Sequence, residues 1–359
     1  MLIIALGFCL LKECSSRYKE GLPLLIAEAE KMSSRLCVCC RAIPLDPELK
    51  TLNAYEYDGP TTWYLGSFEE VRRRSCPFCE LIASICTAGS SSWEPLTPPT
   101  DSTRIDVRYL GGGFCVEGQS PVGSYVCIAA QLAKEVPYCA RAQFPEWIDF
   151  NDVHRWISTC EQKHGSGDSP ECSPVTFNPA VLPRNSKRQL DFRLIDVEAM
   201  CIVYAPRQCR YIALSYVWGR RNKSRLVLTG DNEEALMEPG ALALSEARTS
   251  IPNTILDAMS VVRKLRERYL WVDSLCLLQD EANELQDCVA VMDLFYEMAV
   301  LTIVAASGED AWSGLPGVAP TPRRINRLVK DITPGLKMTT IVDMDTLLRR
   351  SVYSSRAWT

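Results

Sequence analysis

The sequence lacks an excess of basic residues, and this argues against one broad class of function. Its 359 residues include 39 Lys and Arg against 44 Asp and Glu, for a formal net charge of −5. A general nucleic-acid-binding protein normally carries a basic stripe that contacts phosphates. The longest basic cluster, the three arginines at 72–74, is too short to provide one, and we interpret it as a solvated helix face. We therefore predict that nucleic acid is not a partner.

A membrane anchor and a secretion signal are also missing from the pattern. Residues 1–11 are mostly apolar, but this run is too short to span a bilayer. No basic n-region precedes it, and no small-residue cleavage site follows it before Cys14 and Arg17. We therefore predict no membrane partner, and we expect a cytoplasmic, reducing location.

The chain has no glycine-rich phosphate loop, since Gly111-Gly-Gly113 follows no strand–helix pattern. Histidine is scarce, with two residues, and no cysteine lies in a recognisable activating context, which disfavours a papain-like nucleophile. Cysteine, in contrast, is abundant, with seventeen residues. An odd number in a chain of this length fits a secreted disulfide framework poorly. We therefore expect most of the cysteines to be metal ligands or small core residues.

Four of these cysteines form two C-x2-C pairs, Cys37-Val-Cys-Cys40 and Cys76-Pro-Phe-Cys79. Each pair can direct both of its sulfurs toward one zinc ion, with Zn–S bonds of about 2.3 Å. The interval between the pairs exceeds that of a zinc ribbon, so we expect it to carry its own strand and helix. Ser67, with Glu70 three residues later, predicts a capping box at the start of this helix, which we expect to continue through Cys79 to Ile85. The alternative is that Cys39, Cys76 and Cys79 only pack on a helix. Because paired spacing in a reducing compartment favours metal, we predict zinc on Cys37, Cys40, Cys76 and Cys79.

A second candidate cluster lies in Trp156-Ile-Ser-Thr-Cys-Glu-Gln-Lys-His164. Cys160 and His164 are four residues apart, on one face of a predicted helix, and Cys172 follows on a loop. Cys139 or a distant cysteine would have to supply a fourth ligand. The alternative is a Cys–His pair with a purely structural role.

Composition divides the chain into four segments. Residues 166–190 are rich in Gly, Ser, Pro and Asn and are the best linker candidate. Before them we predict an N-terminal helical segment at 1–35 and a Cys-rich, candidate zinc-binding α+β region at 36–165. After them, at 191–359, we predict an α/β domain.

The α/β prediction depends on alternating patterns. Apolar runs of strand length alternate with amphipathic helical patterns, the strands at 193–197, 210–216, 269–278 and 300–306 and the helices at 252–268 and 284–299. Nearly unbroken apolar strands between helices are typical of a parallel sheet covered on both faces. We therefore predict a parallel sheet with helices on both faces.

Polar and aromatic residues follow two of these strands. Ser215 and Tyr216 end the run at 210–216 and Trp218 follows it, and we expect Asp273 and Ser274 to reach the same sheet edge from the next strand. Ligands of open α/β sheets bind outside the carboxyl ends of the strands. A carboxylate, hydroxyl groups and a tryptophan gathered there would suit a nucleotide. The alternative is that the tryptophans anchor the core and Asp273 caps a turn.

The motifs of this region resemble, in family order, those of the fungal heterokaryon incompatibility (HET) domain, an intracellular cell-death module. The resemblance covers about residues 190–359 and depends on Arg193-Leu-Ile-Asp-Val197, Tyr211-Ile-Ala-Leu-Ser-Tyr-Val-Trp-Gly219, Ile251-Pro-Asn-Thr-Ile255, Arg268-Tyr-Leu-Trp-Val-Asp-Ser-Leu-Cys276, Gln279-Asp280, Ala305-Ala-Ser-Gly-Glu-Asp-Ala311, Gly314-Leu-Pro-Gly317 and Arg356-Ala-Trp-Thr359.

HET domains are similar to TIR domains, so the resemblance implies a flavodoxin/TIR-like fold. By analogy with TIR enzymes, it also implies a site that cleaves NAD. In the family, Arg-x-Trp-Thr is followed by a Gln-Glu pair that would supply the catalytic glutamate, whereas this chain ends at Thr359. We therefore expect a domain incomplete at its carboxyl end, a fragment or regulatory remnant, that is inactive toward NAD in this form.

Three functions remain as hypotheses. The first is programmed cell death or innate immunity signalling, in which the HET domain associates with other HET-domain or incompatibility proteins, or with itself. The second is an NAD glycohydrolase, with Ser215 and Asp273 as candidate catalytic residues. The third is a zinc-dependent protein-binding module.

Overall fold

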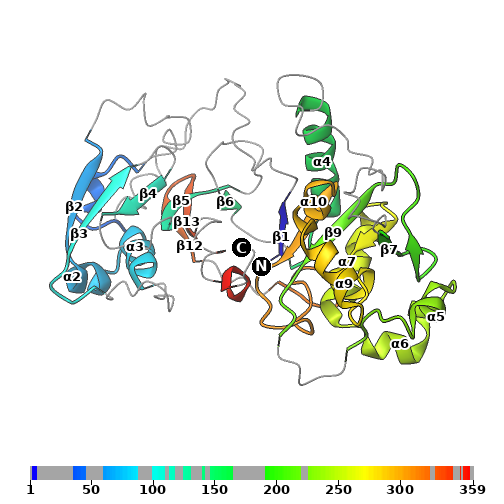
Figure 1. Cartoon of the computed structure of the whole chain (residues 1–359). Helices are drawn as coiled ribbons and strands as arrows, with labels where there is room; N and C mark the ends of the chain where they lie inside the picture. Colours follow the sequence, from blue (N-terminus) through cyan, green and yellow to red (C-terminus); the bar gives the residue numbers. More distant parts are fainter. Residues whose placement is uncertain are drawn as a thin grey trace. The chain divides into compact units, whose positions relative to one another are not determined.

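The computed structural model describes part of the chain, namely residues 2–5, 35–45, 60–87, 99–109, 113–117, 124–130, 140–141, 146–164, 191–219, 225–323, 328–342, 348 and 351–355. The chain divides into two compact units (Figure 1). Unit 1 comprises Met1–Lys12, Pro145–Arg324 and Ser351–Thr359. Unit 2 comprises Glu13–Phe144 and Ile325–Arg350. No helix in the described part is long and apolar enough to cross a membrane.

Unit 1 contains a mixed sheet with three parallel strands at its centre. The sheet order is β1-β11-β9-β10-β7-β8. Strand β9 is parallel to β10 and β11, and every other pair is antiparallel. The strands are β1 (Leu2–Ala5), β7 (Arg193–Asp196), β8 (Cys201–Tyr204), β9 (Tyr211–Ser215), β10 (Tyr269–Trp271) and β11 (Leu301–Ala305).

The prediction of a parallel sheet is therefore correct for the three central strands and wrong for the edges. Strand β7 forms an antiparallel hairpin with β8 because the turn between them, residues 197–200, is far too short for a parallel crossover. Asp196 Oδ1 fixes this turn by accepting hydrogen bonds from the Glu198 and Ala199 amides, at 3.0 and 2.9 Å. At the other edge, Leu2–Ala5 is a strand, which fits the interpretation of the apolar run at 1–11 as a buried helix or the start of a strand, within the segment 1–35 that was predicted to be helical. Residues 6–34 lie outside the described part.

Helical connections separate the three parallel strands. The chain passes from β9 through α5 (Glu233–Met237), η5 (Ala241–Ala243), α6 (Ser245–Ser250) and α7 (Asn253–Lys264) to β10. It then passes through α8 (Asp273–Cys276), α9 (Ala282–Val289) and α10 (Met292–Glu297) to β11. Because β10 and β11 lie on opposite sides of β9, the strand order reverses at β9. Binding sites of open α/β sheets lie at such a reversal.

The core of unit 1 explains why these segments fold as they do. All five side chains of β9 are buried, as are Ile255, Met259 and Val262 on one face of α7. Helix α4 (Phe150–His164) adds Val153 and Ile157 to the same core. Residues 146–164, included in the predicted Cys-rich region, are therefore grouped with unit 1.

Unit 2 contains an antiparallel sheet of order β12-β13-β5-β4-β3-β2, with β6 paired in parallel to β5. The strands are β2 (Thr62–Ser67), β3 (Arg104–Tyr109), β4 (Gly113–Val116), β5 (Ser124–Ala130), β6 (Ala140–Arg141), β12 (Val329–Thr333) and β13 (Leu336–Val342). The last two strands come from the predicted HET region, so the sequence boundary at 191 does not separate the two units.

Three short helical segments accompany this sheet, namely η1 (Cys40–Ala42), α2 (Phe68–Arg73) and α3 (Pro77–Thr87). Helix α2 begins with the predicted capping box: Ser67 Oγ accepts from the Glu70 amide at 3.3 Å, and Glu70 Oε2 accepts from the Ser67 amide at 2.7 Å. A single helix continuing through Cys79 was predicted. The chain instead breaks after Arg73 and begins α3 at Pro77, since proline fits a first turn but lacks the N–H of a helix interior.

Candidate functional site

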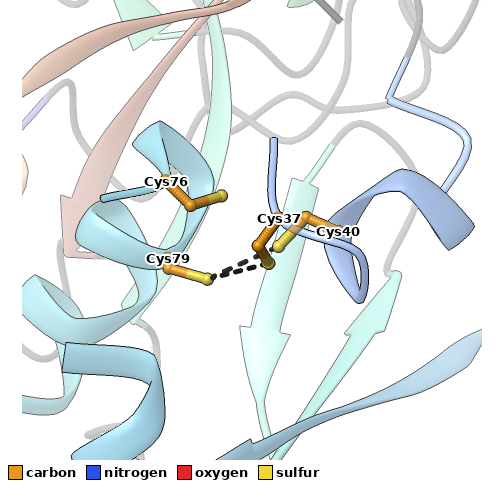
Figure 2. A group of neighbouring side chains, drawn as sticks. All are labelled: Cys37, Cys40, Cys76 and Cys79. Carbon is orange, nitrogen blue, oxygen red and sulfur yellow. Dashed lines mark hydrogen bonds between the residues drawn. The ribbon is translucent and has the colours of Figure 1, made fainter. Parts of the chain in front are cut away.

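The four predicted zinc ligands converge in unit 2. The sulfur atoms of Cys37, Cys40, Cys76 and Cys79 all lie within 4.8 Å of one another (Figure 2). Cys79 Sγ is 3.5 Å from Cys40 Sγ and 3.7 Å from Cys37 Sγ. Tetrahedral coordination with Zn–S bonds of about 2.3 Å places sulfurs about 3.8 Å apart. The separations therefore fit a tetrathiolate metal site, and all four cysteines are free thiols.

Local structure explains how each pair presents its sulfurs. Cys37 and Cys40 lie on a tight turn held by hydrogen bonds from the Arg41 amide to the Cys37 carbonyl and from the Ile43 amide to the Cys40 carbonyl. Cys76 immediately precedes α3, and Cys79 lies in its first turn. The exposed amides and positive dipole end of a helix stabilise thiolates there.

The electrostatics of the cluster favour a bound cation. Hydrogen bonds with Cys76 and Cys79, followed by burial, raise the pKa of Cys40, whereas hydrogen bonds with Cys40 and Cys79 lower the pKa of Cys76. Without metal, hydrogen bonds within the cluster thus favour a thiolate at Cys76 and disfavour a second thiolate at Cys40. A divalent cation removes this conflict because its ligands bind as thiolates.

Arg74 supplies a further positive charge that the sequence patterns did not identify. Burial lowers the pKa of Arg74, but the nearby Cys39, Cys79 and Cys37 raise it by more. Its Nη1 donates a hydrogen bond to the Leu65 carbonyl, which holds the guanidinium in place. A cation beside a tetrathiolate site offsets part of its negative charge. Its position two residues before the second C-x2-C pair was the available signal.

The alternative of simple packing fits these cysteines less well. Cys39 is half-buried and does not belong to the four-sulfur group. Cys86, at the other end of α3, shows the behaviour of a packed cysteine, since burial alone raises its pKa to about 12. Four sulfurs at one point are not needed for packing.

The second predicted cluster stays a prediction. Cys160 is buried on α4. The backbone of His164 ends the same helix, but its side chain lies outside the described part, as do Cys172 and Cys139. The structure therefore does not place these residues around a common point.

The predicted polar cluster at the sheet edge of unit 1 is assembled by side-chain hydrogen bonds. Trp218 Nε1 donates to both carboxylate oxygens of Asp273, at 3.0 and 2.9 Å. Tyr216 Oη donates to Ser274 Oγ at 2.9 Å. These bonds join the segment after β9 to the segment after β10. Ser215, at the end of β9, hydrogen-bonds instead with Tyr353 Oη at 2.8 Å.

Asp273 is almost completely buried, with 8% of its surface exposed. Besides the Trp218 bond, its Oδ1 accepts from the Ser274 amide at 2.7 Å. The Gln279 side chain donates to the carbonyls of Asp273 and Leu277, at 3.0 Å each. Much of the hydrogen-bonding capacity of this motif is thus used within the protein, which agrees with the alternative that Asp273 fixes a turn.

Two contacts at this edge were missed by the sequence analysis. Arg225 lies with its guanidinium carbon 4.3 Å from the centre of the Trp218 ring and donates to the Trp218 carbonyl at 2.9 Å. Gly219, with φ +76°, lies against Asp310 after β11, where an added Cβ would be 2.4 Å from the Asp310 Cβ. Only glycine fits this approach. The loops following all three parallel strands therefore meet at this edge.

Comparison with known protein families finds a similarity over part of the chain. Residues 211–359 match the sequence model of the family described as Heterokaryon incompatibility protein (HET). The match begins at the first residue of β9 and includes all the residues of the polar cluster. It also includes β12 and β13 of unit 2. Searches of curated proteins and of solved structures found no match.

Proposed function

We propose that the chain acts in heterokaryon incompatibility, as a programmed cell-death signalling protein, because its residues 211–359 match the HET family model. The family match carries this proposal. The mechanism that we propose is association of the HET domain with other HET-domain or incompatibility proteins, or with a second copy.

The polar cluster supports a role in holding a surface rather than in bond cleavage. Trp218, Asp273 and Gln279 all belong to family-matched motifs, and each forms hydrogen bonds within the protein that fix a loop at the sheet edge. A rigid set of loops at one edge suits recognition of another protein, because little conformational entropy is lost on binding.

Induced expression in a fungal host tests this proposal. We expect the parent chain to reduce viability and Trp218→Ala to abolish that effect. Leu244→Ala, which changes a side chain that is 65% exposed and distant in sequence from the motif, serves as the control and should retain the effect. Normal viability with a folded, well-expressed parent would contradict the proposed signalling role. Co-purification of differently tagged copies tests self-association.

Cleavage of NAD is the second candidate function, and the position of the cluster favours it. A carboxylate, a hydroxyl group and a tryptophan lie where the strand order reverses, the usual ligand position in such sheets. A folded version of the chain extended past Thr359, where the resemblance places the catalytic glutamate, should then release nicotinamide on incubation with NAD, and Asp273→Asn should reduce the rate. Absence of release from that folded version would reject this function.

We also propose that Cys37, Cys40, Cys76 and Cys79 bind one structural zinc ion, and that the resulting unit can serve as a zinc-dependent protein-binding module. Their mutual distances support this assignment. Zinc would join the turn at Cys37–Cys40 to the start of α3, two segments far apart in sequence. Elemental analysis should find one zinc per chain, and replacement by cobalt should give the visible absorption of a tetrahedral tetrathiolate. A metal-free, folded protein would exclude the site.

A cytoplasmic location is part of the proposal. Every cysteine whose side chain the structure describes is a free thiol, which is what a reducing compartment maintains.

A further inference from the structure

A hairpin from the HET-matched region forms part of the unit that contains the four-cysteine centre. Strands β12 and β13 are joined at Pro334 and Gly335, and Gly335 has the φ of +77° that this tight turn requires. Strand β13 pairs along its length with β5, from Met338 opposite Ile128 to Val342 opposite Ser124. The hairpin lies within the unit 2 segment Ile325–Arg350, and the chain belongs to unit 1 before this segment, up to Arg324, and after it, from Ser351.

The hairpin packs on the two segments that carry the cysteines. Ile332, Leu336 and Met338 are almost completely buried, in the same core as Cys40 and Phe78. This arrangement places the apolar side of the hairpin in one continuous core with the metal-binding turn and helix α3.

Polar contacts join the same elements. Thr333 Oγ1 donates to the Leu45 carbonyl at 3.1 Å, at the end of the segment that contains Cys37 and Cys40. Lys330 forms an ion pair with Glu80, the residue that follows Cys79 in α3. The hairpin therefore contacts both halves of the centre, each within a few residues of a ligand.

We propose that metal binding at the four cysteines controls the docking of the β12–β13 hairpin, so that the centre acts as a metal-dependent lock on a segment of the HET domain. This inference rests on the zinc binding proposed above. Metal fixes the turn at 37–45 relative to α3, and the hairpin contacts both of these elements in addition to pairing with β5. When the metal is removed, the turn keeps only its short-range backbone hydrogen bonds, and the hairpin loses one of its supports.

The coupling must act in both directions. If metal favours the docked hairpin, then a docked hairpin favours metal binding by the same factor. Because both ends of the hairpin continue into unit 1, its release would lengthen the connections within the HET-matched region. Loss of metal would thereby release the hairpin segment of the HET-matched region while leaving the polar cluster at the sheet edge unchanged.

Hydrogen–deuterium exchange of the full chain tests the lock. Zinc content is measured first, because a chain that binds no metal refutes the zinc site itself. With zinc bound, chelation should accelerate exchange of residues 329–342 about tenfold or more, together with residues 37–45. The parallel strands at 211–215 and 301–305 should be unchanged. Unchanged exchange at 329–342, with faster exchange at 37–45, would overturn the lock and leave the zinc site intact.

Hairpin variants test the reverse direction. Ile332→Ala removes a fully buried side chain, and Lys330→Ala removes the ion pair with less risk to folding. Both should weaken zinc binding in a competition assay, Ile332→Ala by about tenfold or more. Lys337→Ala is the matched control, because Lys337 is half-exposed and pairs with Asp331 within the hairpin. Parent-like zinc affinity in Ile332→Ala, with faster exchange of its hairpin, would overturn the proposal.

Discussion

Replacement of Cys79 by alanine should remove metal from the four-cysteine centre and destabilise unit 2 far more than the loss of one sulfur from the core would. Cys79 Sγ lies 3.5 Å from Cys40 Sγ and 3.7 Å from Cys37 Sγ, so it shares a metal position with both. The matched control is Cys86→Ala, because Cys86 lies on the same helix, is buried to a similar degree and contributes no ligand.

The expected difference follows from linkage. Loss of one buried sulfur should cost about 1 kcal/mol in either variant, the value for a group the size of a methylene. A metal present at 1,000 times its Kd adds about 4 kcal/mol to the stability of the folded state. Since a whole domain is stable by roughly 5–15 kcal/mol, Cys79→Ala should unfold unit 2 under mild conditions and Cys86→Ala should not.

The assay is thermal or urea unfolding in buffered free zinc, with the zinc content of each variant measured in parallel. The parent and Cys86→Ala should each contain one zinc, and Cys79→Ala should contain much less. Equal zinc content and equal unfolding midpoints in the two variants would show that Cys79 is only a packing residue. The reasoning from sulfur geometry would then be wrong.

Three further outcomes are expected in unit 1, all measured by unfolding. Arg193→Met should cost about 3–5 kcal/mol, because Arg193 is 2% exposed and its loss removes the buried cation that pairs with Glu233 and Glu284. Arg268→Met, at a half-exposed site, should cost distinctly less, and equal losses would contradict the reasoning. Burial raises the pKa of Asp196, but Arg268 and two backbone amides lower it by more. Because the net shift is downward, ionised Asp196 stabilises the fold above its unfolded pKa of about 3.9, and this contribution disappears as pH falls through the lower folded value. Asp196→Asn should therefore flatten the acid side of the stability profile, and an unchanged profile would reject the assignment. Trp218→Phe keeps an aromatic ring but removes the indole N–H that donates to buried Asp273, so we expect a loss of about 1–3 kcal/mol of stability. Parent-like stability would show that this hydrogen bond is not structural.

Local patterns were sufficient for part of the fold and of the site. The apolar runs that became β9, β10 and β11 are separated by helical segments, and such a separation permits parallel pairing. The two C-x2-C spacings identified all four residues of the sulfur group. The pairing of β1 with β11 was not predicted, because the two strands are distant in sequence and no local period indicates it. Strand β8 was not predicted either, although its partner β7 is adjacent in sequence and the turn at 197–200 was the local sign of that hairpin.

Residue spacing alone determined which groups the chain contains: paired thiols, a hydroxyl and a carboxylate after buried strands, and a region, 211–359, that matches the HET family model. Only the tertiary structure decided how segments distant in sequence share that chemistry. It placed β12 and β13 beside β5 and joined Trp218 to Asp273. The physical reason is that hydrophobic periodicity shows which face of a single helix or strand is buried, but not which element covers it. An apolar face can be buried against any complementary face in the folded chain. The choice among such faces depends on packing over the whole unit.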